Sequence, residues 1–200
     1  MKYSEFTAIV DANEAHRSAL TPRLTDIKSD GLLLRVVENK TPEMYLAAVR
    51  QNGNALMYIK DQTPELCLVA VRENGFSLQY VKNQTPELCM AAVMREGWAL
   101  EYVEKQTPEI CLVAVNQNGL TLHHVKEQTD EICLAAVEQT GRALDSVEVQ
   151  TPEICLAAVS QNGYALIYVK TQTPEICLAA VDQGGKGVLK YVNRSIFDPE

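Results

Sequence analysis

The chain has 200 residues, of which 46% are hydrophobic and 22% charged, and its formal net charge is −8. This is the balance of a soluble globular protein with enough apolar side chains to form a core. No apolar run approaches the roughly 20 residues of a membrane helix, and the acidic N-terminal stretch lacks the apolar centre of a secretory signal. We therefore expect a cytoplasmic protein without membrane contact. The acidic balance, with no cluster of Lys or Arg, disfavours general binding to a nucleic-acid backbone.

The first part of the chain differs from the rest. Residues 1–18 carry Phe6, Ile9 and Val10 at helical spacing, which predicts an N-terminal cap helix. Residues 19–40 form a degenerate repeat, because SDGLLLRVVENK aligns with QNGNALMYIKDQ in the segment that follows. We expect both to belong to one domain with the remainder of the chain.

From Thr41 onward, a Thr and a Gly each recur every 22 residues, so that residues 41–195 hold seven copies of one repeat. Residues 196–200 form a C-terminal tail, in which we expect Ile196 and Phe197 to close the end of the stack. Positions within a copy are counted below from its Thr. Each copy opens with Thr-Pro-Glu, except that Asp130 replaces the Pro in one of them.

The opening residues predict the start of an α-helix. Thr accepts hydrogen bonds from unpaired backbone N–H groups, Pro has no N–H to lose there, and Glu suits the positive end of the helix dipole. Six apolar residues follow, as in Ile154–Val159. Since six consecutive residues cover every side of a helix, we expect this helix to be buried all round. We expect the Gly at position 13 to end it in a left-handed conformation.

A second short element occupies positions 14–20, as in Tyr164–Lys170. Leu at position 16 and Val or Ile at position 19 share a face, which fits one or two helical turns, partly 3₁₀. The Asn-Gly pairs could instead mark a β-hairpin. Ala-Ala in the first element is poor strand material, and Thr-Pro-Glu has no purpose before a strand, so the helical interpretation is favoured.

Two short helices cannot bury an apolar face by themselves, whereas stacked copies can. The sequence therefore predicts an all-α helical-repeat solenoid. It would consist of seven 22-residue two-helix repeats, a degenerate N-terminal repeat, and caps.

The motifs Thr-Pro-Glu, Cys-Leu-Ala-Ala-Val, Asn-Gly and Leu-x-Tyr-Val recur in this order over residues 41–195. This pattern resembles the bacterial and viral repeat family known as domain of unknown function 4116. The joins between copies are shorter here than in typical members of that family. The resemblance implies a helical repeat and no catalytic residue.

Cysteine recurs at position 5 in six copies. Equivalent positions on packed helices lie about 8–10 Å apart, which exceeds the roughly 7 Å between Cα atoms that a disulfide allows. Zinc-ligand spacings are absent. We expect free thiols that fill small spaces in the core, in a reducing compartment. The residues are Cys67, Cys89, Cys111, Cys133, Cys155 and Cys177.

Other polar rows also have simple explanations. His123 and His124 are adjacent, but Cys111 and Cys133 lie within apolar runs, so a Cys–His nucleophile is not expected. The Glu at position 3 fits the helix dipole better than a metal site. The Gln at position 22 predicts a polar ladder that pairs backbone groups between copies. We expect no enzyme activity, no cofactor and no bound metal.

Positions 10, 14 and 17 vary freely between copies while the scaffold positions do not. We expect them to form one stripe, with aromatic and Arg side chains typical of partner-binding surfaces. The alternative is that unconstrained positions have simply drifted. The candidate residues of this stripe, with the neighbouring position 18 of one copy, are Arg72, Phe76, Gln79, Met94, Trp98, Glu101, Leu120, His123, His124, Arg142 and Tyr164.

The first functional hypothesis is a non-enzymatic protein–protein interaction scaffold that binds a partner protein along this stripe. In a phage or bacterial setting it would be an effector, or an inhibitor that occludes a host enzyme. The second is a repeat protein that binds single-stranded RNA base by base; the third is an acidic mimic of nucleic acid. The net charge opposes the second, and the sequence leaves the oligomeric state open.

Overall fold

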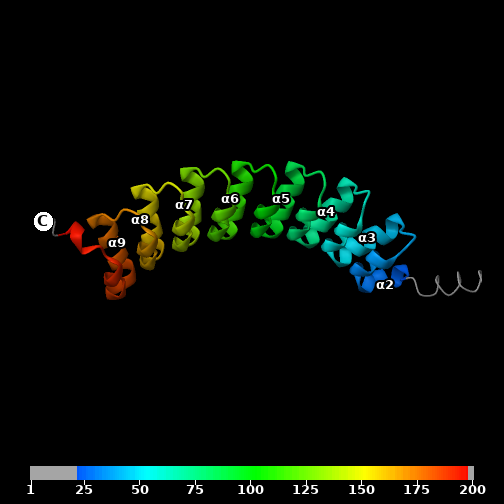
Figure 1. Ribbon diagram of the computed structural model, residues 1–200, viewed down its shortest axis with the longest axis horizontal. Helices are drawn as coiled ribbons and strands as arrows, with labels where there is room; N and C mark the ends of the chain where they lie inside the picture. The colour runs from blue at the N-terminus through cyan, green and yellow to red at the C-terminus, as the bar shows by residue number, and fades with distance from the viewer. Residues whose placement is uncertain (1–21, 198–200) are drawn as a thin grey trace, which may run out of the picture. The chain divides into compact units, whose positions relative to one another are not determined.

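The computed structural model describes residues 22–197, in which α-helices alternate with 3₁₀ helices and no strand occurs (Figure 1). The all-α helical repeat is thereby confirmed. The α-helices are α2 (Leu24–Ser29), α3 (Pro42–Gln51), α4 (Pro64–Glu73), α5 (Pro86–Arg95), α6 (Pro108–Gln117), α7 (Asp130–Gln139), α8 (Pro152–Gln161) and α9 (Pro174–Gly184). The 3₁₀ helices are η1 (Gly31–Val36), η2 (Gly53–Tyr58), η3 (Gly75–Tyr80), η4 (Gly97–Tyr102), η5 (Gly119–His124), η6 (Gly141–Ser146), η7 (Gly163–Tyr168), η8 (Gly185–Tyr191) and η9 (Arg194–Ile196).

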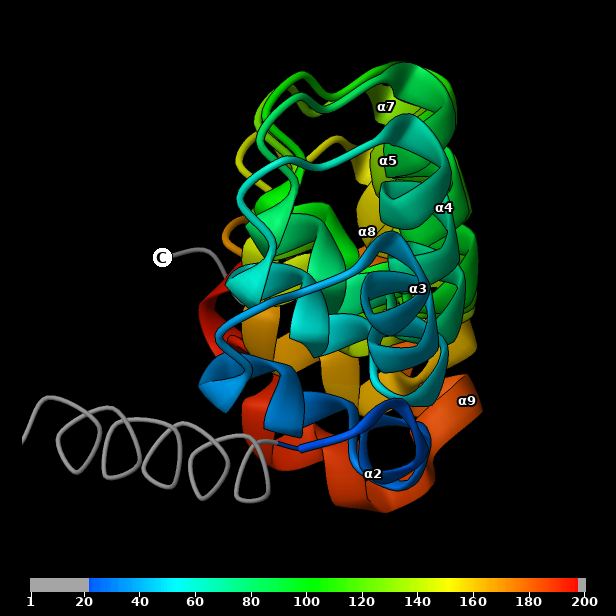
Figure 2. The ribbon, with the colours of Figure 1, turned by 90° about the vertical axis from the view of Figure 1, so that its right-hand side faces the viewer.

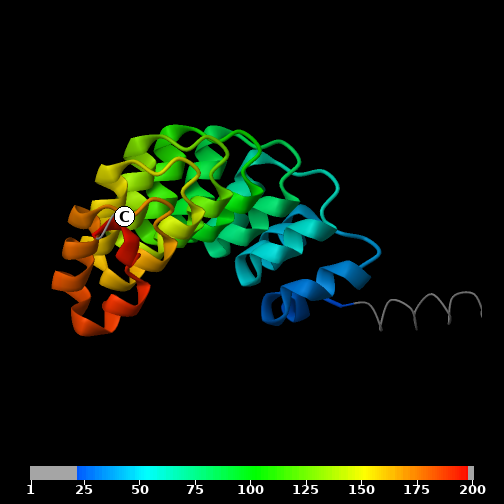
Figure 3. The same cartoon turned by 60° about the vertical axis from the view of Figure 1, so that its left-hand side comes forward.

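The chain divides into two compact units between Asn83 and Gln84, and each unit is described by itself. Within each unit, every α-helix packs on the α-helix of the next copy, and the η helix that follows it packs on the η helix of the next copy. In Figure 2, α3 and α4 lie on one side and the η helices of the same copies on the other, and Figure 3 shows the α-helices of the second unit side by side. Each unit therefore has an α layer and a 3₁₀ layer. The single domain stays a prediction, and the cap helix predicted at 1–18 lies outside the described residues.

The predicted helix start is confirmed in every full copy. The Oγ1 of Thr107 accepts a hydrogen bond from the backbone N–H of Ile110 at 3.4 Å, and Pro108 is the first helical residue. A hydrogen bond with Thr107, and then one with its own backbone N–H, lower the pKa of Glu109. The Glu row is thus part of the helix start, as the dipole argument predicted.

The prediction that the α-helix is buried all round is wrong. In α8, Ile154, Cys155, Ala158 and Val159 are buried, but the Leu and Ala between them, residues 156–157, are half-buried. Neighbouring copies cover two sides of the helix and the 3₁₀ layer covers a third, so one side faces outward. Positions 6 and 7 form that outer side in each copy.

The prediction of a left-handed Gly at position 13 is wrong in every copy but the last, where Gly185 stands at this position. Among residues 22–197, only Gly185 has a positive φ, of 67°. Elsewhere position 12 turns the chain in an extended conformation, as Asn118 does with φ −154° and ψ 109°, and its Oδ1 accepts from the N–H of Leu120. A Cβ on Gly119 would lie 2.2 Å from the carbonyl oxygen of Ala136 in the next copy. Glycine is therefore required for close approach between copies.

The core lies between the two layers. Leu at position 16, for example Leu100 and Leu144, has no exposed surface, and neither does Ala at position 8. Burying one such Leu completely is worth about 1.5–3 kcal/mol relative to leaving it exposed. The same side chain contributes in every copy, which explains why the period is so strict.

Ile196 and Phe197 cover the last copy incompletely. Phe197 lines a hollow of about 320 Å³ together with Leu178, Val181 and Leu189. Leu178 is 65% exposed, and Val181 is half-buried whereas its equivalent Val159 is fully buried. The predicted closure by Ile196 and Phe197 is therefore only partial.

Candidate functional site

A ladder of glutamine amides joins the copies, as predicted for position 22. The Nε2 of Gln106 donates to the backbone oxygens of His124 at 2.8 Å and Leu100 at 3.4 Å. Its Oε1 accepts from the backbone N–H of Lys126 at 2.9 Å. The side-chain amide thus donates to one backbone oxygen of the next copy and accepts from one of its backbone N–H groups, as the backbone of a neighbouring β-strand would. The same rung is built by Gln62, Gln84, Gln128, Gln150 and Gln172.

The cysteine recurs because its thiol belongs to this ladder. The Sγ of Cys111 lies 3.6 Å from the Oε1 of Gln106, and all six thiols make the same contact at 3.3–3.8 Å. All six are free and buried, as predicted. Burial is the main cause that raises the pKa of each thiol. A buried, protonated thiol that donates to an amide is a poor nucleophile.

The raised thiol pKa values predict that stability falls in alkaline solution. The folded state holds the thiol proton more firmly than the unfolded state, whose pKa is about 8.5. The stabilisation is therefore complete below that pH and is lost as the pH rises through the folded pKa. We expect the Tm to fall more steeply above about pH 8.5 for the natural chain than for a variant with Cys111→Ser and Cys133→Ser.

Circular dichroism melts between about pH 7 and about pH 10 would measure both curves. Serine keeps a donor for the Gln oxygen but does not titrate, so the comparison removes the contribution of other groups. Parallel curves for the two proteins would contradict the role of the thiols.

The candidate stripe residues of the first unit lie on α4 and η3. Phe76 is half-buried on η3, and Gln79 is exposed one turn further on, with its Nε2 donating to the backbone oxygen of Phe76 at 2.9 Å. Arg72 is exposed at the end of α4. Positions 14 and 17 thus share the outer side of the 3₁₀ layer, as their spacing predicted.

In the second unit, three candidate rings come together. The indole of half-buried Trp98 on η4 lies 5.6 Å from the ring of His123 and 5.7 Å from that of His124, both on η5. The two imidazole centres are 3.6 Å apart. We call Trp98, His123 and His124 the ring cluster. It joins position 14 of one copy to positions 17 and 18 of the next.

One hydrogen bond to the backbone and the partial burial of Trp98 and His124 hold the ring cluster in place. The Nδ1 of His123 lies 2.9 Å from the backbone oxygen of Leu120, so Nδ1 carries the proton and donates it. Burial lowers the pKa of His124, His123 lowers it further, and Glu101 acts in the opposite direction. The lowered pKa favours the neutral form of His124, whose ring meets the indole of Trp98 edge-on.

A similar arrangement occurs near the C-terminus. Arg142 and Tyr164 line a hollow of about 150 Å³ with Ile167 and Tyr191. The rings of Tyr164 and Tyr191 are 6.3 Å apart at 74°, and Lys190 Nζ lies 4.8 Å above the Tyr191 ring. Tyr164 at position 14 of one copy thus contacts the ring of Tyr191 in the next copy. Since Tyr191 and Ile167 line the same hollow, we add them to the candidate residues.

Position 10 lies in the other layer. Met94 is 65% exposed at the end of α5, and Gln117 Nε2 donates to its backbone oxygen at 3.1 Å. In the first unit, Arg50 at position 10 lines a hollow with Glu43, Leu46 and Ala47 on the outer side of α3. Arg72 and Met94 are therefore α-layer residues, while the other candidates lie on η helices. A single stripe that combines both layers stays a prediction.

Between residues 22 and 197, no three His, Cys, Asp or Glu side chains gather as the ligands of a metal ion would. None of the described helices has the length and apolar character needed to cross a membrane.

No curated protein and no solved structure shows significant similarity to the chain. The resemblance inferred from the repeated motifs is confirmed over the first two full copies: the model of the family described as Domain of unknown function (DUF4116) matches residues 41–85.

Proposed function

We propose that the protein is a non-enzymatic scaffold that binds a partner protein through the outer side of its 3₁₀ layer. The observation that carries this proposal is the ring cluster of Trp98, His123 and His124. A half-buried indole in contact with other rings is the kind of anchor that dominates protein–protein interfaces.

The geometry of the cluster supports tight binding at low entropic cost. The His123 ring is fixed by its hydrogen bond to the Leu120 backbone, and the indole is fixed by both imidazoles. Side chains that are already ordered lose little freedom when a partner docks. Exposed Glu101 lies one turn from Trp98 and supplies a polar rim, while Tyr164 adds a second aromatic position that is 46% exposed.

In a phage or bacterial setting, this scaffold acts as an effector, or as an inhibitor that occludes a host enzyme. Repeated copies present binding positions over an extended surface, which suits a protein that covers another. Six free thiols favour a reducing compartment such as the cytoplasm.

Combined replacement of Trp98→Ala and Phe76→Ala is expected to abolish capture of the partner from extracts of the native host. Truncation of aromatic anchors in an interface typically costs at least about 2 kcal/mol each, which is more than tenfold in affinity. Affinity purification with mass spectrometry would identify and quantify the captured protein, with circular dichroism to verify the fold.

Asn116→Ala is the matched control, because Asn116 is exposed in the α layer and should not change recovery. Unchanged recovery with the double variant would refute the 3₁₀-layer site. If the protein bound single-stranded RNA with an affinity that falls steeply as salt rises, the partner would be a nucleic acid and not a protein.

A further inference from the structure

The outer side of the α layer in the first unit carries three parallel rows of side chains. In α3 and α4, position 3 is acidic, position 10 is basic, and the aliphatic positions 6 and 7 lie between them, while α2 adds an aliphatic residue at position 6 and a base at position 10. All these side chains are exposed or half-buried. The rows are Glu43 and Glu65; Leu24, Leu46, Ala47, Leu68 and Val69; and Lys28, Arg50 and Arg72.

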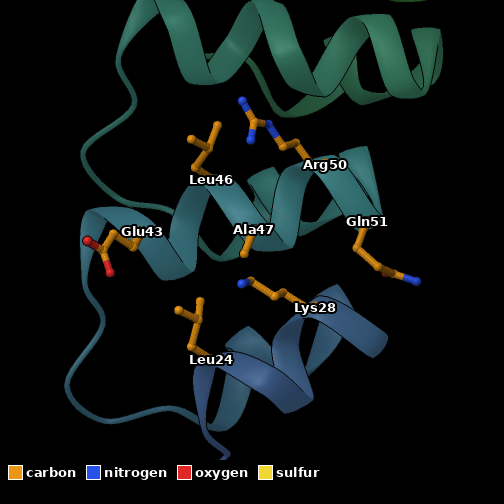
Figure 4. Close-up of a pocket in the computed structure, with 7 residues that line it drawn as sticks. All are labelled: Leu24, Lys28, Glu43, Leu46, Ala47, Arg50 and Gln51. Atoms are coloured by element: carbon orange, nitrogen blue, oxygen red, sulfur yellow. The ribbon is translucent and has the colours of Figure 1, made fainter.

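Figure 4 shows this face around a hollow of about 490 Å³ between α2 and α3. Glu43 lies at one end of α3 and Arg50 at the other, with Leu46 and Ala47 between them. Lys28 and Leu24 of α2 complete the lining. The hollow thus has an aliphatic floor with an acidic side and a basic side.

The spacing of the rows makes the face complementary to itself. Positions 3 and 10 are seven residues apart, which is two turns or about 10.5 Å along the helix. Their midpoint falls between positions 6 and 7, which are Leu46 and Ala47 in α3. If an identical helix is laid on this one in the opposite direction, acid meets base at both ends and the aliphatic residues meet in the middle.

We propose that this face binds the same face of a second copy of the chain, with the helices antiparallel. Glu43 then faces Arg50 of the partner subunit, and Glu43 of the partner subunit faces Arg50. The symmetry axis passes between Leu46 and Ala47, so that a large side chain packs beside a small one. Such an isologous contact uses the same patch twice, which is the usual geometry of a homodimer.

Two features favour a second copy over another partner. The spacing of the α-helices is identical in the two subunits, so each α-helix of one subunit can lie against an α-helix of the other. The charge pattern is also self-complementary only in the first unit. In the second unit, position 10 carries no base, and Glu131 would face Glu138 of the partner subunit. Its position 10 residues are Met94, Asn116, Glu138, Ser160 and Asp182.

The contact is independent of the proposed partner site, which lies in the 3₁₀ layer. The contact buries only small rows of aliphatic side chains that are already partly covered. Its ion pairs are exposed to solvent and are therefore screened by salt. The dimer should therefore be weak, and it should dissociate as the salt concentration rises.

Sedimentation velocity over a concentration series tests this, at about 0.01 M and about 1 M salt, where the Debye length falls from about 30 Å to about 3 Å. We expect twice the mass of one chain at low salt and a single chain at high salt. Arg50→Glu places acid against Glu43 of the partner subunit and should weaken association at least tenfold. Glu43→Arg should do the same, and the combination of both should restore the dimer.

Arg142→Glu is the control for net charge, because it changes the charge equally but lies in the 3₁₀ layer. It should leave association unchanged. A chain that stays monomeric at low salt overturns the proposal. So does a folded double variant that fails to dimerise while the natural chain does.

Cross-linking provides a second measurement close to the symmetry axis. Ala47→Cys should form a disulfide-linked dimer when diamide oxidises the two new thiols, whereas the natural thiols are buried. Ala157→Cys occupies the same position in the second unit and should remain uncross-linked. Equal cross-linking of both variants would contradict an interface confined to the first unit.

Discussion

Replacing Gly119 by Ala should destabilise the second unit by about 3 kcal/mol or more, a large loss for one added methyl group. The new Cβ would lie 2.2 Å from the backbone oxygen of Ala136 and 2.9 Å from Cγ2 of Thr140. The first contact is with helix backbone, which cannot rotate away. Moving α7 to relieve it would also break the 2.7 Å hydrogen bond from the Gly119 N–H to the Oε1 of Gln139.

Gly97 offers a matched control within the same unit. A Cβ there would lie 3.1 Å from the backbone oxygen of Ala114, so a shift of a few tenths of an ångström accommodates it. We expect Gly97→Ala to cost about 1 kcal/mol. Urea unfolding followed by circular dichroism would measure both, with hydrogen exchange of α7 to localise the change. Equal losses would show that close approach between copies does not fix this glycine.

The sequence was sufficient to predict the helices, but not the role of the glycine at position 13. The period and the Thr-Pro-Glu starts identified the helices, because each start is a local signal repeated in every copy. The role of the Gly was misassigned because a glycine is compatible with two causes, a positive φ and a lack of space. Only the position of Ala136, 17 residues further along the chain, decides between them.

The burial of the α-helix was misjudged for a related reason. Leu156 and Ala157 are as apolar as their buried neighbours, and the apolar run carries no mark of which side lacks a covering layer. In the structure, neighbouring copies and the 3₁₀ layer cover three sides of the α-helix, and positions 6 and 7 lie on the side that is left open. The outer side that results is the face proposed above as a dimer contact in the first unit.

The candidate site was predictable by position but not by contact. Variation between copies pointed to Trp98 and His123, yet it did not say that position 14 of one copy meets the next copy's rings. Tyr191 was missed because Tyr recurs at this place in most copies, so variation between copies does not single it out. The packing of each η helix on the η helix of the next copy brings these pairs together.

The second large effect concerns the glutamine ladder. Gln106→Leu should destabilise the protein by about 1–3 kcal/mol, the cost of a buried backbone group that loses its partner. The variant leaves the N–H of Lys126 and the carbonyl of His124 unpaired, and the thiol of Cys111 loses its acceptor. Gln79→Leu is the control, because that amide is exposed and bonds only within its own turn, to Phe76.

Gln106→Glu separates the two halves of the rung. The introduced carboxyl can still accept from the Lys126 N–H, but only its protonated form can donate to the His124 carbonyl. The folded state therefore raises the pKa of that carboxyl above its unfolded value of about 4.3. Its stabilisation is complete below that unfolded pKa and is lost as the pH rises through the folded pKa. We expect urea unfolding to show Gln106→Glu close to the natural chain near about pH 4 and clearly weaker near about pH 7. A constant difference between the two proteins over this range would mean that donation to His124 is not what the amide contributes.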